Sequence, residues 1–167
     1  KELHKQTGWD YLSRYKDGID LLQRNSYDHI VLTGKYDTII NCIAYTNTYD
    51  MDREKHWDIN YKGVSILTDF CNLNDLKLVH ISTDYLYAHS LPDASENDVP
   101  LHCANWYGYT KLLADGYVQL KSSNYLLIRS THKAEPFVHK TAFNQKGNFD
   151  YVSVIANIII SLVKKNA

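Results

Sequence analysis

The chain has 167 residues, a formal net charge of −1 and 44% hydrophobic residues, the composition of an ordinary globular domain. Basic and acidic residues are interspersed, and the apolar runs are too short to cross a bilayer, so we expect neither a nucleic-acid-binding nor a membrane-embedded protein. The three cysteines are widely spaced and the eight histidines show no metal-binding spacing, which predicts no disulfide framework, no metal site and a cytoplasmic location.

The first part of the chain mixes short helices with apolar segments. Residues 1–6 have the pattern of a helix end, which Gly8 closes by adopting a left-handed conformation. The apolar residues 9–12 follow and are expected to form a strand. Ser26 is predicted to cap a short helix, and residues 36–44 have the continuous apolar pattern of a buried parallel strand.

The remaining chain alternates longer helices with short strands. A helix is expected over residues 52–73, where apolar residues recur at helical spacing, and a second buried strand at 78–81. Another helix is predicted at 105–120, followed by a third apolar strand at 125–128. Asp150 is expected to cap the final helix.

Strands that alternate with helices indicate an α/β domain with a parallel sheet and helices on both faces. The apolar segments at 39–44, 78–82 and 126–128 are expected to be neighbouring central strands. We expect a single domain over residues 1–167.

One helix carries the most informative residues for function. Tyr107 and Lys111 are one helical turn apart, so they lie on the same helix face, and Tyr117 and Lys121 repeat this spacing further along. Context favours the first pair. Tyr107 lies at the start of its predicted helix, and Thr83 lies at the end of the preceding buried strand, where parallel sheets place their active sites.

A tyrosine, a lysine and a hydroxyl in this arrangement can protonate a carbonyl oxygen during hydride transfer. A free tyrosine has a pKa of about 10, and a neighbouring ammonium lowers that pKa because it favours the phenolate. We therefore expect Lys111 to lie beside the Tyr107 hydroxyl and to lower its pKa. The Thr83 hydroxyl is expected to bond the same substrate oxygen.

Several motifs occur in the order typical of one enzyme family. They are residues 39–46 (IINCIAYT), Asn60, residues 79–85 (VHISTDY), residues 105–112 (NWYGYTKL) and residues 127–129 (LIR). Together they resemble the motifs of dTDP-4-dehydrorhamnose reductases and related sugar-nucleotide-binding proteins, which are extended short-chain dehydrogenases. The resemblance implies a Rossmann-like, NAD(P)-binding domain.

The resemblance also implies a role for each matching residue. Tyr107 is the implied proton donor, Thr83 assists at the substrate carbonyl, and Lys111 bonds the nicotinamide ribose and tunes Tyr107. The residues implied to contact the cofactor are Asn41, Ala44, Tyr45, Asn60 and Lys111.

The cofactor and the substrate follow from the same resemblance. Arg14 follows the expected strand at 9–12, and an arginine there suits the 2′-phosphate of NADP, with NAD as the alternative. The implied substrate is a nucleotide-activated deoxysugar whose 4-keto group is reduced. A homodimer is compatible with this family.

The sequence departs from the family pattern at two places. The first strand and the Gly-rich turn that cradles the pyrophosphate are absent from it, which predicts weak dinucleotide binding, and the substrate-binding portion around 131–149 is short. A non-catalytic NAD(P)-binding regulatory module is therefore an alternative to a reductase. A sugar-nucleotide epimerase or dehydratase is a further alternative, which Asp84 and Tyr85 disfavour because dehydratases carry an acidic pair there and epimerases smaller residues.

Overall fold

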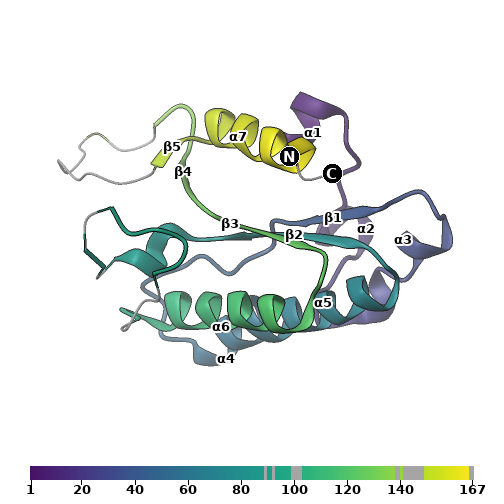
Figure 1. The fold of residues 1–167 in the computed structure, drawn as a ribbon, viewed down its shortest axis with the longest axis horizontal. Helices are drawn as coiled ribbons and strands as arrows, with labels where there is room; N and C mark the ends of the chain where they lie inside the picture. The colour runs from purple at the N-terminus through teal and green to yellow at the C-terminus, as the bar shows by residue number, and fades with distance from the viewer. Residues whose placement is uncertain (89, 92, 99–102, 138–139, 141–148, 166–167) are drawn as a thin grey trace.

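The computed structural model describes residues 1–88, 90–91, 93–98, 103–137, 140 and 149–165. Its centre is a three-stranded sheet that lies between two layers of helices (Figure 1). The α-helices are α1 (Glu2–Thr7), α2 (Arg14–Asp17), α3 (His29–Leu32), α4 (Arg53–His56), α5 (Gly63–Leu73), α6 (Trp106–Lys121) and α7 (Val152–Lys165). The shorter helical segments are the 3-10 helices η1 (Arg24–Ser26) and η3 (Asp84–Tyr87) and the π-helix η2 (Trp57–Lys62).

The main sheet is parallel throughout. It consists of β1 (Thr38–Asn41), β2 (Lys77–Ser82) and β3 (Tyr125–Arg129), in the order β1-β2-β3. Both pairings are parallel, which confirms the predicted α/β class and the predicted neighbouring strands. The carboxyl ends of the three strands therefore meet at one edge of the sheet, where open α/β folds bind their ligands.

Side chains alternate between the two faces of this sheet, as the pleat of a strand requires. On one face, Leu78 of β2 belongs to a core cluster with Val64 of α5 and Val118 of α6. On the other face, Val79 of β2 packs with Ile159 of α7. Figure 1 shows the same division, with α5 and α6 on one side of the sheet and α7 on the other.

The expected helix over 52–73 is one continuous helical run in three parts. Asp52 caps α4 by accepting a hydrogen bond from the Lys55 backbone N–H at 3.0 Å. The π-helix η2 follows directly and leads into α5. A π-turn inside an α-helix is rare and often occurs at functional sites. Here it carries Asn60, which is completely buried.

Three local predictions were wrong. Residues 8–13 form no strand, because they have no strand beside them to supply hydrogen bonds. Ser26 ends η1 and bonds the backbone of Asp20 instead of capping a helix. Asp150 lies inside the strand β5, and its carboxylate accepts a hydrogen bond from the Tyr151 N–H, so it does not precede α7 as a cap.

The segment after the main sheet contains a second, small sheet. β4 (Thr131–Lys133) pairs in parallel with β5 (Phe149–Tyr151), and α7 follows β5. The portion around 131–149, which the sequence associates with substrate binding, thus begins and ends in strands. No helix in the described part of the chain is long and apolar enough to cross a membrane.

Candidate active site

The carboxyl end of β2 leads directly into the candidate site. Thr83 follows the last residue of β2 and is almost fully buried. Its hydroxyl oxygen accepts a hydrogen bond from the Tyr85 N–H at 3.1 Å and so caps η3. This cap fixes the Thr83 side chain at the sheet edge, where a hydroxyl can reach a bound substrate.

The helix α6 starts opposite this strand end. Asn105 caps it, since its side-chain oxygen accepts a hydrogen bond from the Gly108 N–H at 2.9 Å. Tyr107, Lys111 and Asp115 then follow at intervals of one helical turn and share one face of α6. The Thr83 side chain lies close enough to the Tyr107 hydroxyl to affect its pKa. The structure therefore brings the predicted threonine and tyrosine together.

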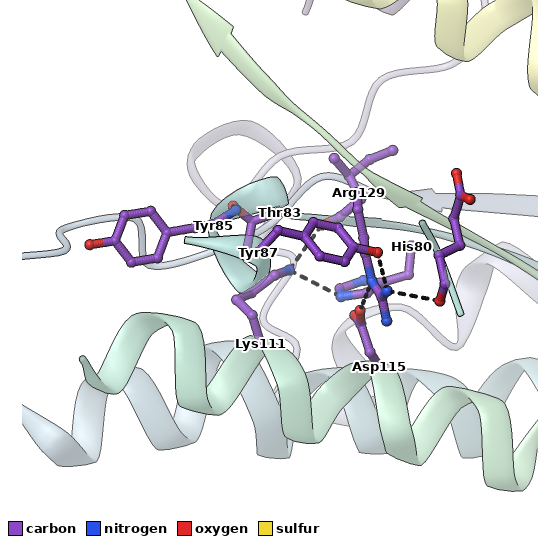
Figure 2. Close-up of polar contacts among 9 residues, drawn as sticks. His80, Thr83, Tyr85, Tyr87, Lys111, Asp115 and Arg129 are labelled. Carbon is purple, nitrogen blue, oxygen red and sulfur yellow. Dashed lines mark hydrogen bonds and ion pairs between the residues drawn. The ribbon is translucent and has the colours of Figure 1, made fainter. Parts of the chain in front are cut away.

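Lys111 reaches under the sheet instead of toward Tyr107. Its side chain is 1% exposed, and Nζ lies 3.0 Å from His80 Nε2 and donates to the carbonyl oxygen of Ile81 at 2.9 Å. Figure 2 shows the Lys111 side chain rising from α6 to these two partners on β2. Burial lowers the pKa of Lys111 to about 8, because the charged ammonium is removed from water.

The predicted effect of Lys111 on Tyr107 is not found. The pKa of Tyr107 is raised, mainly because burial disfavours the phenolate, while the nearby Thr83 side chain lowers it by a smaller amount. The acidic residues Asp84 and Asp115 raise this pKa further. The phenol is thus held in its protonated form, the form that can donate a proton.

A buried ion pair continues this region along α6 and β3. Arg129, the last residue of β3, donates from Nε to Asp115 Oδ2 at 3.0 Å, and its Nη1 donates to the Tyr87 hydroxyl and to the carbonyl oxygen of Glu96. The side chain of Arg129 is 12% exposed and that of Asp115 is 1% exposed. We call the polar side chains of this region the polar layer; its members are Asn41 and His80, which lie 3.2 Å apart, Lys111, and the pair of Asp115 and Arg129.

Three members of the polar layer, namely His80, Asp115 and Arg129, were not predicted as site residues. A usable signal was present for each of them. His80 interrupts an apolar strand segment, Arg129 directly follows one, and Asp115 follows Lys111 by one helical turn. A polar residue in a buried strand requires a partner, so these positions were candidates for a buried network.

The loop after β1 is held by the buried amide of Asn60. This amide accepts a hydrogen bond from the Tyr45 N–H at 2.7 Å and donates to the Tyr45 carbonyl oxygen at 3.0 Å. His56 packs edge-on against the Tyr45 ring, with the ring centroids 4.9 Å apart. Asn60 therefore fixes the backbone of Tyr45, next to Ala44. The sequence associates both Ala44 and Tyr45 with the cofactor.

A groove lies beside the free edge of β1. It has a volume of about 960 Å³, and we call it the β1 groove. It is lined mainly by residues 8–15, 19–22 and 35–43. Arg14 lies at this groove, with its side chain 71% exposed and Nη2 3.8 Å from Asp20 Oδ2.

The second tyrosine–lysine pair lies elsewhere on α6. The Tyr117 hydroxyl donates to the carboxylate of Asp69 on α5 at 3.0 Å, and its ring packs edge-on against Tyr61. Tyr117 thus joins two helices on the outside of the sheet. The described residues contain no cluster of three or more histidine, cysteine or acidic side chains arranged to hold a metal ion.

Known proteins share both the sequence pattern and the fold. The profile of the family described as "RmlD substrate binding domain" matches residues 1–164. The spore coat polysaccharide biosynthesis protein SpsK of Bacillus subtilis is 23% identical over 95% of this chain and 62% of its own length. The dTDP-4-dehydrorhamnose reductase of Mycolicibacterium smegmatis is 29% identical over 66% of this chain and 34% of its own length.

A solved structure agrees with this assignment. The dTDP-4-dehydrorhamnose reductase of Bacillus anthracis, crystallised in complex with NADP, has a TM-score of 0.78 and 20% sequence identity, over 98% of this chain and 67% of that one. This likeness shows the fold, and the chain spans less than two thirds of the two curated relatives. Because the family profile covers almost the whole sequence, the chain belongs to the RmlD substrate binding domain family.

Proposed function

We propose that this chain carries the catalytic part of an NAD(P)H-dependent reductase that acts on the 4-keto group of a nucleotide-activated deoxysugar. The observation that carries the proposal is the convergence of Thr83 and Tyr107 at the carboxyl end of the parallel sheet, where the Thr83 side chain affects the pKa of the tyrosine. Relatives named as dTDP-4-dehydrorhamnose reductases support the choice of substrate class.

The donor groups of the site fit a dinucleotide at its nicotinamide end. Lys111 offers an amine under the end of β2, and the loop of Ala44 and Tyr45 follows the end of β1. We propose that these residues hold NADP, or NAD, when it is bound. The reduced nicotinamide then supplies the hydride. Asn41 and Asn60 are buried and bonded within the protein, so we propose that they shape this loop.

The protein's own groups supply the proton and the orientation of the substrate. The raised pKa of Tyr107 keeps its phenol protonated near neutral pH, so it can donate to a developing alkoxide. The Thr83 hydroxyl lies beside it and can donate a hydrogen bond to the same oxygen. Thr83 is fixed by its own cap of η3, which limits the cost of orienting it.

The test compares two tyrosines on one helix. With dTDP-4-dehydrorhamnose as substrate and NADPH as reductant, Tyr107→Phe is expected to lower kcat by about a hundredfold or more, the scale of losing a general acid. Tyr117→Phe is the matched control. Its hydroxyl is roughly 15 Å from the site along α6 and bonds Asp69, so turnover is expected to stay near the wild-type value.

Two outcomes contradict this proposal. Full turnover by Tyr107→Phe excludes the tyrosine as proton donor. A wild-type chain that binds NADPH without reducing the sugar nucleotide favours the regulatory module instead.

A further inference from the structure

The 3-10 helix η3 is short, and each of its ends is held by a different element. It has only four residues, and the hydrogen-bond geometry of a 3-10 turn is too poor to hold such a segment by itself. Its start is held by the Thr83 cap. Its last residue, Tyr87, is held from β3, because the Tyr87 hydroxyl accepts a hydrogen bond from Arg129 Nη1.

The guanidinium of Arg129 is itself fixed in place. Arg129 pairs with Ser82 in the parallel register of β2 and β3, so its backbone lies beside the strand end that leads to Thr83. Its Nε donates to Asp115 Oδ2 at 3.0 Å, and this pair is largely buried. A planar guanidinium that is anchored at Nε has its other N–H groups in set directions. Nη1 therefore faces η3 with a defined geometry.

The same nitrogen also holds the chain beyond η3. Arg129 Nη1 donates to the carbonyl oxygen of Glu96 at 3.3 Å, and Cζ lies 5.3 Å from the centre of the Tyr87 ring. Glu96 belongs to a tight turn in which the Asp98 carboxylate accepts from the Ser95 N–H and hydroxyl. Figure 2 shows the guanidinium beside the Tyr87 hydroxyl. One side chain thus connects β3, α6, η3 and this turn.

The position of η3 matters because η3 borders the candidate active site. Tyr85, in the middle of η3, lies edge-on to the Tyr107 ring, with the ring centroids 6.1 Å apart. The Tyr85 N–H is also the donor to the Thr83 hydroxyl oxygen. A displacement of η3 would therefore move the ring that lies beside Tyr107 and release the Thr83 side chain from its cap.

We propose that Tyr87 and Arg129 are positioning residues that hold η3 against the active-site tyrosine. The guanidinium, anchored on α6, fixes the end of η3. Thr83 and Tyr85, at the start of η3, thereby keep their places beside Tyr107. The effect on turnover rests on the proposed function, whereas the placement of η3 does not. A positive charge alone is not sufficient for this role, because the Tyr87 hydroxyl needs an N–H that points to it.

The placement of η3 can be measured without substrate. Tyr87→Phe keeps the ring beneath the guanidinium and removes only the hydroxyl that accepts from Nη1. The N–H groups of Ala88 and Ser90 donate back to carbonyl oxygens of η3, at 3.2 and 2.9 Å, so their hydrogen exchange reports its opening. We expect their protection factors to fall about tenfold, the scale of a hydrogen bond to a charged group. Wild-type protection in Tyr87→Phe overturns the role of Tyr87.

Tyr117→Phe is the matched control. It also removes a hydroxyl that is hydrogen-bonded to a charged side chain, in this case the Asp69 carboxylate at 3.0 Å, between α6 and α5. The protection of Ala88 and Ser90 should stay at the wild-type value. If Tyr117→Phe lowers it equally, the effect is a general loss of stability and the proposal is wrong.

A second variant separates geometry from charge. Arg129→Lys keeps a positive charge opposite Asp115, but a single ammonium cannot replace the fork of a guanidinium that reaches all three partners. We expect the protection of Ala88 and Ser90 to fall about tenfold here as well. Wild-type protection in Arg129→Lys overturns the role of the guanidinium. If this variant does not fold, Tyr87→Phe decides the matter by itself.

The contact with Tyr107 gives a readout that a purely structural role would not change. In tyrosine-labelled protein, the nuclear Overhauser effect between the rings of Tyr85 and Tyr107, assigned with Tyr107→Phe, should be clearly weaker in Tyr87→Phe than in the wild type or Tyr117→Phe. An undiminished effect overturns the link from Tyr87 to the site.

Kinetics connect this placement to the proposed reaction. With dTDP-4-dehydrorhamnose and NADPH, Tyr87→Phe should lower kcat by roughly tenfold, because the groups around the substrate lose their alignment. The KM for NADPH should stay within about twofold, since Asn60 and not η3 holds the loop of Tyr45. Wild-type kcat in Tyr87→Phe overturns the positioning role. If the wild type has no reductase activity, the reductase proposal fails, while the exchange and ring measurements still decide this one.

Discussion

Asn41 belongs to the polar layer and also lines the β1 groove, and these two neighbouring regions are built in opposite ways. In the polar layer, Asn41, His80, Lys111 and Asp115 are buried and the Arg129 side chain is only 12% exposed, and each of these side chains is bonded to another member. The ion pairs beside the groove are exposed, as in the pair of Lys35 and Asp10, with 63% and 44% exposed side chains. Residues of the same type therefore contribute differently to stability in the two regions.

Burial explains this difference. A charge removed from water requires a partner with good geometry, so the loss of one partner leaves a large uncompensated cost. An exposed charge stays solvated and loses little when its partner is removed. Substitutions in the polar layer should therefore cost stability, whereas equivalent substitutions at the β1 groove should cost very little.

The largest effect is expected for the buried ion pair. Arg129→Met leaves the Asp115 carboxylate buried without a counter-charge, so the free energy of unfolding should fall by about 3–5 kcal/mol. Urea denaturation followed by circular dichroism measures the change. Lys35→Met, which breaks the exposed pair with Asp10, is the control and should unfold at nearly the wild-type urea concentration. Equal losses in the two variants would remove the contrast between the two regions.

The contrast also explains what could be predicted from the sequence. The central strands were predictable, since each is a short apolar run, and Thr83 and Tyr107 were predictable from their places at a strand end and a helix start. The direction of the Lys111 amine was not predictable from spacing. One helical turn places Lys111 on the same face as Tyr107, but its long side chain extends to His80, whose position depends on the register of β1 and β2.

The expected strand at 9–12 failed for a related reason. An apolar pattern indicates that a segment can form a strand, but a strand also needs a neighbour for its backbone hydrogen bonds. In the described residues, β1 pairs with β2 alone, and residues 9–12 line the β1 groove. The local sequence contains no information about whether such a partner is present.

The next largest effect concerns the pH dependence of stability at Lys111. The folded-state pKa is lowered from 10.5 to about 8, so the unfolded chain binds the proton more tightly. The free energy of unfolding of the wild type, relative to Lys111→Met, should therefore rise by about 3 kcal/mol as the pH increases from about 8 to about 10.5. Below pH 8 the difference should be constant, because the lysine is then protonated in both states.

The appropriate measurement is the difference in the free energy of unfolding between the wild type and Lys111→Met. Burial also raises the pKa of Cys71 and Tyr27 to about 12, and both residues act in the opposite direction at high pH. They are present in both proteins, so their contributions cancel. Urea denaturation at several pH values gives the difference directly. A difference that does not vary with pH would show that the buried lysine keeps an ordinary pKa.

A smaller effect is expected at the start of α6. Asn105→Ala removes the side-chain oxygen that caps α6 by accepting from the Gly108 N–H, and also the hydrogen bond to the Thr48 carbonyl oxygen at 2.9 Å. The free energy of unfolding should therefore fall by about 1 kcal/mol. Ser13→Ala removes the cap of α2 at the β1 groove and is the comparison. Because α2 has only four residues and buries none of them, its loss should be smaller. If Ser13→Ala lowered the free energy of unfolding more than Asn105→Ala does, the expected order of the two caps would be wrong.

The smallest effect on stability is expected at Arg14. Its side chain is 71% exposed and lies 3.8 Å from the Asp20 carboxylate, so Arg14→Ala should unfold at the same urea concentration as the wild type.

The predicted role of Arg14 is instead to face the 2′-phosphate of NADP from the β1 groove. A charge-assisted contact of this kind contributes about 1.5–3 kcal/mol, so removing it should lower the preference for NADPH over NADH by about tenfold or more. Fluorescence titrations with both nucleotides measure this ratio, and Arg24→Ala, which pairs with Asp28 and does not line the groove, is the matched control. If both variants keep the wild-type ratio, Arg14 has no part in choosing the cofactor, and the β1 groove does not recognise the 2′-phosphate through this residue.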